Sequence, residues 1–289
     1  MMITYAQNRE DVLLRRAFAW DYKGFYVDVG ANDPIEYSVT KHFSIHGWRG
    51  INIEPHPELH RKLCEDRPHD INLNIGASDQ HATLEYLECV SNLGLSTFSP
   101  TMADKLRQRD GLEFAGRSVP VRPLAEIFEE HVKGTIDFLK IDVEAHEREV
   151  ISGNDWTRWR PRIVVVEATK PERWEPLLLE AGYLSAAFDG INLYYVRREE
   201  PELLGPLKAP LSCLDAWTPH TVQRSLDDHK TRADFFQRQF IQVDSELARY
   251  REIGPNALVI AHKLHGLSTR YPRLARACKR LAGLNAPSA

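Results

Sequence analysis

The sequence is poor in cysteine, and this scarcity limits what the chain can be. The four cysteines are widely separated and form no CxxC pair, so the sequence predicts neither a zinc site nor a disulfide framework. A reduced, cytoplasmic setting is the simplest interpretation. The four are Cys64, Cys89, Cys213 and Cys278.

Three other signals are also missing. No stretch reaches 18 consecutive apolar residues, which argues against a conventional membrane-spanning helix. The first residues, MMITYAQNREDVLL, contain no basic segment followed by an apolar one, so no signal peptide is expected. The net charge of −4 provides no basic excess, and a nucleic-acid partner is therefore not expected.

The composition that remains is typical of a globular protein. The chain has 289 residues, of which 43% are hydrophobic and 27% charged. This length supports a mid-sized core and favours one large domain with or without an appendage. We expect a domain over residues 1–200, followed by a Pro-rich connector and a helical C-terminal extension over residues 201–289.

Strand-like and helix-like segments alternate through the first 200 residues. Strands are expected at 24–30, 49–55, 70–79, 82–88, 135–144 and 161–168. Helices are expected at 9–20, capped by Asn8, and at 35–47, 57–66, 121–131, 145–153 and 171–182. This alternation predicts an α/β fold with an open, mostly parallel sheet covered by helices on both faces.

One segment breaks the alternation. Residues 183–196, YLSAAFDGINLYYV, are two apolar runs around Asp189-Gly190, which is a strong signal for a two-residue hairpin. The sheet is therefore expected to end with an antiparallel pair.

The composition changes after residue 200. Residues 201–220 contain four prolines and no periodicity, as expected of a connector. An apolar stripe then recurs at spacings of four and three, which indicates a helix that packs on the main domain or pairs at a homodimer contact. Its members are Phe236, Phe240, Val243, Leu247 and Tyr250.

The last 35 residues contain six basic side chains and no acid. A solvated basic helix face explains this pattern, and so does weak contact with an anionic glycan carrier, a membrane surface or an acidic partner. The six are Lys263, Arg270, Arg273, Arg276, Lys279 and Arg280.

Acidic residues follow the expected strands. In doubly wound sheets, ligands bind at the carboxyl ends of the strands. Five such ends with an acid indicate a functional cleft rather than chance. The residues found there are Asp28, Gly30, Ala31 and Asn32, then Glu54, then Ser78 and Asp79, then Asp142 and Glu144, and finally Glu167.

The turn after the first strand separates two classes of cofactor. Gly30 permits close approach to the backbone and Glu54 is placed for a ribose diol, which suits a nicotinamide dinucleotide or S-adenosylmethionine. A dinucleotide normally needs GxGxxG, whereas this turn has one glycine, and Asp28 and Asp33 would repel a pyrophosphate. A sulfonium is cationic and carries no phosphate, so acids favour it.

Five segments, in this order, resemble the FkbM family of S-adenosylmethionine-dependent methyltransferases: YVDVGANDP, GWRGINIEPHPELHRKL, NLNIGASD, IDFLKIDVEAHEREVISG and PRIVVVEA. The resemblance covers about residues 3–198. It implies a Rossmann-like class I methyltransferase fold and O-methylation, often of sugar hydroxyls in glycans, glycosides or antibiotics. Ala145 departs from the glycine common at that position in the family.

An alcohol is a poor nucleophile, so the acceptor needs a base or a metal ion. Asp142, Glu144 and Glu167 are expected to lie close together, and such oxygen ligands suit Mg²⁺ or Mn²⁺. The arrangement resembles catechol-type methyltransferases. Without a metal, one of these carboxylates could act as the general base.

The sequence leaves two interpretations open for each of four other features. His146 is either a base or a surface helix residue, and Lys140 is either catalytic or the partner of an acid. The loop 92–100 either gates the acceptor or is plain surface. Trp156, Trp159 and Trp174 either stack on a sugar or pack in the core.

Two other functions remain open from the sequence. One is a nicotinamide-dependent oxidoreductase, against which the missing glycines count. The other is a non-catalytic scaffold in a glycan-assembly complex, which would use the C-terminal extension for contact.

Overall fold

The computed structural model describes residues 2–252, 265–266 and 269–273. Contacts divide the chain into two units, Met1–Val222 and Gln223–Ala289. Of the six basic residues near the C-terminus, Arg270 and Arg273 are described, and the other four lie outside the described residues. No helix in the described part of the chain is both long enough and apolar enough to cross a membrane.

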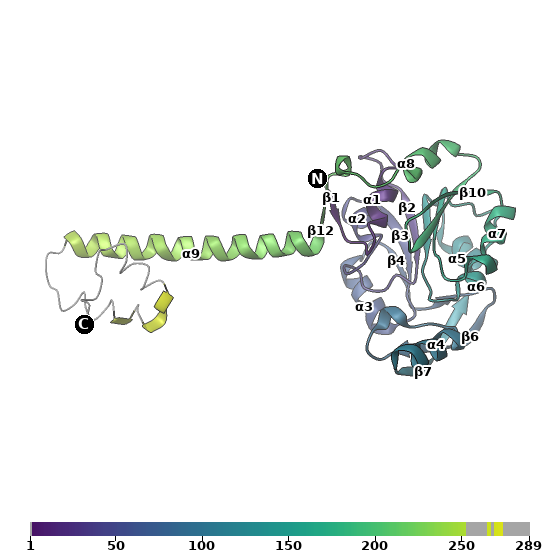
Figure 1. The fold of residues 1–289 in the computed structure, drawn as a ribbon, viewed down its shortest axis with the longest axis horizontal. Helices are drawn as coiled ribbons and strands as arrows, with labels where there is room; N and C mark the ends of the chain where they lie inside the picture. The colour runs from purple at the N-terminus through teal and green to yellow at the C-terminus, as the bar shows by residue number, and fades with distance from the viewer. Residues whose placement is uncertain (1, 253–264, 267–268, 274–289) are drawn as a thin grey trace. The chain divides into compact units, whose positions relative to one another are not determined.

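A seven-stranded sheet forms the centre of the first unit, in the order β10-β11-β9-β8-β2-β3-β4 (Figure 1). Neighbouring strands from β9 to β4 are parallel, whereas β11 is antiparallel to both β9 and β10. The hairpin turn contains Gly190 at φ +100°. The strands are β2 Phe25–Val29, β3 Arg49–Ile53, β4 Ile71–Leu73, β8 Phe138–Ile141, β9 Ile163–Glu167, β10 Tyr183–Phe188 and β11 Asn192–Arg197.

Both faces of this sheet are buried, because its strands are apolar at odd and even positions alike. In β9, Val164 and Val166 pack into one hydrophobic cluster, and Ile163 and Val165 pack into another. Helices α5 Leu124–His131, α6 Glu147–Ser152 and α7 Glu175–Glu180 contribute to the first cluster. Helices α1 Glu10–Arg15, α2 Lys41–Ile45 and α8 Leu204–Lys208 contribute to the second. Such continuous apolar strands are typical of sheets covered on both sides.

Two helix starts differ from the prediction. Asn8 does not cap α1, because Arg9 occupies the N-cap position in a left-handed conformation and the Asn8 side chain donates to the carbonyl of Asp189 instead. The helix expected from residue 35 begins only at Lys41, since residues 33–40 form an irregular loop beside the strand ends.

A second, three-stranded sheet interrupts the alternation, and the sequence did not predict it. The expected strand at 70–79 is split between β4 and β5 Gly76–Ala77, which pairs with β7 Phe114–Arg122. Strand β7 also pairs with β6 Ala82–Cys89. Helix α4 Pro100–Asp110 connects β6 to β7 and is capped by Ser99, whose side chain accepts from the Met102 amide.

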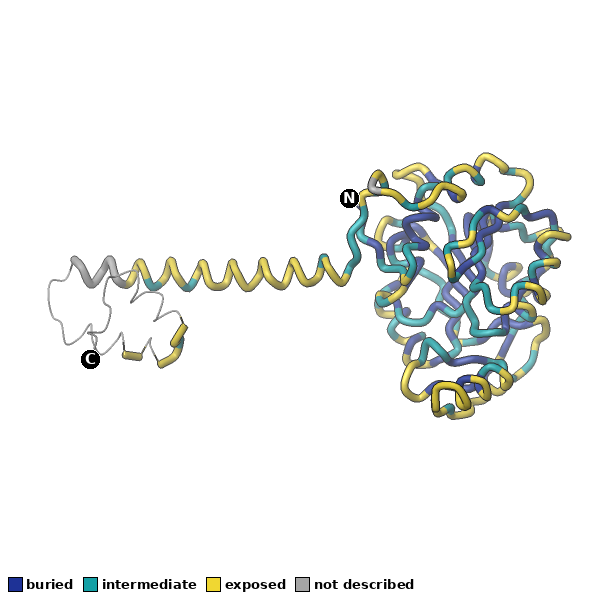
Figure 2. The backbone as a smooth tube through the Cα atoms, viewed as in Figure 1, coloured by how far each residue is buried: buried dark blue, intermediate teal, exposed yellow. Residues whose placement is uncertain are grey.

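The connector packs on the first unit, which extends to Val222. Strand β12 Trp217–Pro219 pairs with β1 Met2–Thr4, and Asp215 receives two hydrogen bonds from Arg16. Helix α3 Pro57–Asp66 begins and ends as expected. Helix α9 follows, over His220–Glu252, and the residues of it whose burial is described are largely exposed (Figure 2).

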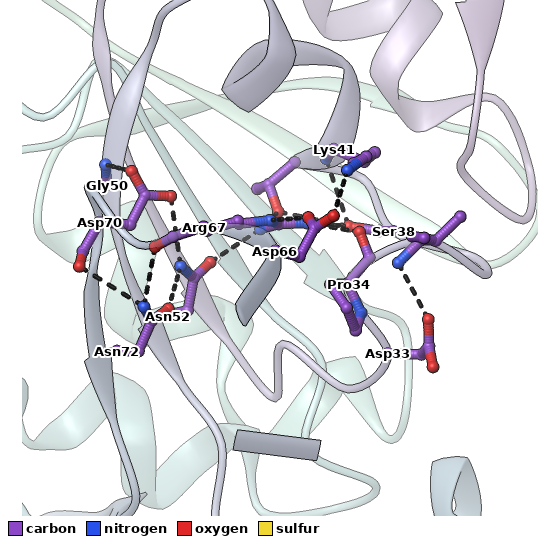
Figure 3. Close-up of polar contacts among 12 residues, drawn as sticks. Asp33, Pro34, Ser38, Lys41, Gly50, Asn52, Asp66, Arg67, Asp70 and Asn72 are labelled. Carbon is purple, nitrogen blue, oxygen red and sulfur yellow. Dashed lines mark hydrogen bonds and ion pairs between the residues drawn. The ribbon is translucent and has the colours of Figure 1, made fainter. Parts of the chain in front are cut away.

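Buried Arg67, which follows α3, fastens the loop 33–40 to the rest of the fold (Figure 3). Its Nη2 donates to the Pro34 carbonyl at 2.9 Å and to Ser38 Oγ at 2.6 Å. Its Nη1 donates to Thr40 Oγ1 at 2.6 Å and to Asn52 Oδ1 at 2.9 Å. One guanidinium therefore holds both ends of this loop against strand β3.

Replacing Arg67 should destabilise the fold strongly. Arg67→Ala leaves four buried acceptors without their donor, and we expect a loss of about 3–5 kcal/mol in the free energy of unfolding. Arg61→Ala is the matched control on α3, because Arg61 makes an exposed ion pair with Glu65. The control should cost less than about 1 kcal/mol in urea unfolding. Equal losses for both variants would contradict the role given to Arg67.

Candidate active site

A cavity of about 470 Å³ opens at the carboxyl ends of β2, β3, β8 and β9. Most residues expected at these strand ends do line it. They are Asp28, Gly30, Ala31, Asn32, Glu54, Lys140, Asp142, Glu144 and Glu167.

Gly30 is required by the packing of the strand ends. Its φ is +78°, and a Cβ at this position would lie 1.9 Å from the Asp142 carbonyl oxygen. The Gly30 and Ala31 amides donate to the Ile53 carbonyl. The bare backbone therefore brings the ends of β2, β3 and β8 together before any ligand is considered.

Asp28 lines the cavity and is 1% exposed. Its Oδ2 accepts from Thr40 Oγ1 at 2.6 Å, which connects it to Arg67 through a shared hydroxyl. Its Oδ1 has no hydrogen-bond partner and lies 3.7 Å from Lys140 Nζ. One carboxylate oxygen is thus left with capacity to accept from a ligand.

Glu54 connects two loops through its carboxylate. Oε2 accepts from the Asn32 amide and Oε1 from the His56 amide, each at 2.8 Å. Burial raises the pKa of Glu54 to about 7, although the two amides oppose the shift. Each oxygen retains a lone pair for a further donor.

Asp142, Glu144 and Glu167 come together as the sequence predicted. Their nearest carboxylate oxygens all lie within 4.8 Å of one another. Burial raises the pKa of Glu144, and repulsion from Glu167 and Asp142 raises it further. Burial also raises the pKa of Glu167, with Asp142 adding to the shift.

The backbone beside these acids is strained. Glu144 and Ala145 both have positive φ, at +51° and +75°. The Glu144 carbonyl accepts from Thr97 Oγ1 at 2.5 Å, which holds the turn in place. A left-handed residue 145 gives a physical reason for a glycine at this position, and Ala145 adopts the same conformation at a cost.

Lys140 forms ion pairs with acids, which is one of the two interpretations that the sequence left open. Its Nζ lies 3.0 Å from Asp142 Oδ2. Burial alone would lower its pKa, but Asp142 and Asp28 raise it above the ordinary value, so the ammonium stays charged. Lys140 is therefore held as a cation between two acids.

Four residues emphasised by the sequence lie elsewhere. Ser78 and Asp79 are not among the residues that line the cavity, and neither is His146. His146 Nε2 lies 3.2 Å from Ser78 Oγ, and burial lowers its pKa. Asp33 forms an ion pair with Lys62 Nζ at 3.0 Å and is not among the residues that line the cavity.

The three tryptophans pack in the core, which decides between their two readings. Trp174 is buried in the first hydrophobic cluster, and Trp156 and Trp159 pack against that cluster.

Several cavity residues were missed. Glu10 is 4% exposed and accepts from Asn192 Nδ2 at 3.0 Å, across 182 residues of chain. Burial raises the pKa of Glu10. Tyr37 lines the cavity, is 65% exposed and has φ +61°. Glu10 lies in the first turn of a predicted helix and Tyr37 lies inside another predicted helix. Neither position indicated a binding site from the sequence.

The loop 92–100 reaches the cavity. Residues 92–96 and Phe98 line it, and the Gly94 amide donates to Asn92 Oδ1. This placement agrees with the gating interpretation of the loop, while gating itself stays a prediction.

Comparison with known proteins adds a family relationship. Residues 28–185 match the family model described as the methyltransferase FkbM domain. No curated protein matches the sequence. One similar solved structure is a methyltransferase FkbM from Methylobacillus flagellatus KT, at 15% identity and a TM-score of 0.36. The similarity covers 61% of this chain and 44% of that one, so this chain spans less than half of it.

The raised pKa values predict that the ligand-free protein loses stability as pH rises. Burial raises the pKa of Glu147 to about 8 and those of Glu54 and Asp11 to about 7. The folded chain then binds more protons than the unfolded chain between about pH 4 and 8, so the free energy of unfolding falls across that window.

Thermal unfolding between pH 5 and 8 measures this slope. Glu147→Gln should flatten it, whereas Glu180→Gln on an exposed helix position should leave it unchanged. Stability that rises from pH 5 to 8 in the wild-type protein would contradict the burial of these protonated acids.

Proposed function

Because this chain belongs to the FkbM methyltransferase family, we propose that it is an S-adenosylmethionine-dependent O-methyltransferase acting on a hydroxyl of a sugar-containing acceptor. The observation that carries this proposal is the acidic cavity at the strand ends, with one glycine in its first turn. The strand order, with antiparallel β11 between β9 and β10, supports a Rossmann-like class I assignment.

The residues at the ends of β2 and β3 suit the cofactor. Asp28 offers an unpartnered oxygen, Glu54 offers acceptors for a ribose diol, and the backbone of residues 30–32 borders the same space. Ser78 and Asp79 do not line the cavity, and they are therefore too remote to contact the cofactor there. When bound, S-adenosylmethionine supplies an electrophilic methyl group on a positively charged sulfur.

The role of the chain is to align the acceptor hydroxyl and take up its proton. Lys140 is unsuitable as a base because its ammonium stays charged. Glu144 and Glu167 border the cavity. Once a bound cation has ionised them, their raised pKa values make them stronger proton acceptors than an ordinary carboxylate. His146 lies outside the cavity lining, so we assign the base to this acidic pair.

The same residues fit a divalent ion. Asp142, Glu144 and Glu167 present three oxygens at mutual distances suited to one cation, and Mg²⁺ or Mn²⁺ prefers such ligands. An ion there would offset the repulsion among the acids and lower the pKa of a hydroxyl bound to it.

We assign the acceptor side to Glu10, Asn192 and Tyr37, of which Glu10 and Asn192 lie outside the family match. Glu10 and Asn192 offer a carboxylate acceptor and an amide for hydroxyl groups. Tyr37 presents an exposed ring at the cavity, held in a left-handed backbone conformation that a bulky residue rarely adopts. A polar wall beside an aromatic ring suits a sugar.

Calorimetry separates the candidate functions. The wild-type protein should bind S-adenosylmethionine and its demethylated product, and should not bind NAD. Glu54→Gln should weaken cofactor binding about tenfold or more, since a charge-assisted bond is lost. Asp33→Asn is the control, because Asp33 pairs with Lys62 away from the cavity. Binding of NAD alone would favour an oxidoreductase, and binding of no nucleotide would favour a scaffold.

Metal titration tests the ion. Mn²⁺ affinity should rise with pH because protons compete for the same carboxylates. Glu167→Gln should weaken it about tenfold or more, while Glu149→Gln should not. Full methyl transfer after complete metal removal would contradict a role for the ion. The carboxylate pair would then act as the base without a metal.

Steady-state kinetics with a panel of simple glycosides tests the acceptor wall. Tyr37→Ala should raise KM for the acceptor up to about tenfold and leave cofactor affinity unchanged, because only ring stacking is lost. Tyr37→Phe should retain the wild-type KM. An equal loss of cofactor affinity in Tyr37→Ala would place Tyr37 on the cofactor side of the cavity and contradict its assignment to the acceptor.

A further inference from the structure

Helix α9 carries an apolar seam that begins earlier in the helix than the stripe at positions 236–250 described above. Apolar or small residues recur at spacings of four and three from position 222 to position 250, with His229 as the polar exception, which is about four heptads. In heptad terms, Leu226, Ala233 and Phe240 occupy a positions, and Val222, Phe236 and Val243 occupy d positions. We infer that α9 pairs with α9 of a second copy of this chain, as an antiparallel two-stranded coiled coil.

The part of the seam whose side chains the structure describes is largely exposed within one chain. Leu226 is 56% exposed, Phe236 is 59% and Phe240 is 46%. A helix gains most of its stability by burying an apolar face against a partner, and propensity alone contributes little. A stripe sustained over four heptads is the spacing that knobs-into-holes pairing needs.

The charges beside the seam identify the partner as a second copy. In the first half, the charged e and g positions are basic, with Lys230 at e and Arg232 at g. In the second half, Asp244 at e and Glu246 at g are acidic, and Arg251 at the last e position of the helix is basic. A helix that is basic in one half and acidic in the other complements itself when it runs in the opposite direction.

Antiparallel pairing places four of these five charges opposite their complements. With the two-fold axis near residue 238, Lys230 faces Asp244 of the second copy, and Arg232 faces Glu246 of the second copy. Gln237 and Gln239 then meet their own counterparts at the axis, with no like charges opposed. Residues at e and g select orientation in this way.

The core layers agree with the same register. Small Ala233 lies opposite branched Val243 of the second copy, and Phe236 lies opposite Phe240 of the second copy. In a parallel, in-register pair Lys230 would instead face Ser225, Arg232 would face Gln237, and His229 would meet His229. The parallel arrangement would pair Glu246 with Arg251 of the second copy, but it would leave Lys230, Arg232 and Asp244 opposite neutral residues. The antiparallel arrangement therefore uses more of the available charge complementarity.

Two variants of the full-length chain test this inference. The acidic variant Lys230→Glu/Arg232→Glu and the basic variant Asp244→Lys/Glu246→Arg each place like charges opposite one another in the antiparallel dimer. We expect each variant alone to self-associate about tenfold or more weakly than wild type, and their mixture to form a heterodimer. Sedimentation and light scattering measure the masses, against 33.2 kDa for one chain.

Matched controls are Arg238→Glu and Asp234→Lys, whose f and b positions face away from the seam; both should remain dimers. Circular dichroism of each variant shows whether helix content is kept, and recovery of the heterodimer on mixing shows that both variants still fold. A monomeric wild-type chain would overturn the inference. So would an acidic variant that dimerises as tightly as wild type, because a parallel pair does not oppose these charges.

Discussion

Uncompensated negative charge at one edge of the sheet is the constraint on which the site depends. Among the described residues that line the cavity, six carboxyl groups surround a single ammonium, that of Lys140. Burial and mutual repulsion raise the pKa values of Glu144 and Glu167, so the ligand-free cavity retains protons that ordinary acids would have lost. A cationic ligand or a divalent ion would relieve this repulsion, whereas a pyrophosphate would add to it.

The scaffold around the cavity holds conformations that the local chain would not adopt alone. Gly30, Glu144 and Ala145 have positive φ where β2 and β8 meet, and Tyr37 has positive φ in the loop 33–40. Arg67 holds that loop through hydrogen bonds, and Thr40 connects the guanidinium to Asp28. Backbone strain of this kind persists only where the surrounding structure over-determines it, and it concentrates at functional sites.

The sequence predicted the parts of the fold that are determined by short-range patterns of residues. Val- and Ile-rich strands such as β9, the Asp189-Gly190 turn and the acids at the strand ends could be read directly from the sequence. Strand β7 could not, because Gly116, Pro120 and its charged residues hide a strand that pairs in a small, partly exposed sheet. The pair of Glu10 and Asn192 joins opposite ends of the domain, and a contact of that range leaves no periodicity in the sequence.

Proton release on cofactor binding tests the central claim most directly. Calorimetry at pH 7 in buffers of different ionisation heat measures the protons displaced when S-adenosylmethionine binds. The sulfonium should stabilise the ionised carboxylates, so more protons should leave the protein with S-adenosylmethionine than with its neutral thioether product. Equal proton release for the two ligands would show that the acids at the sheet edge do not respond to the charge on sulfur, and would contradict the account.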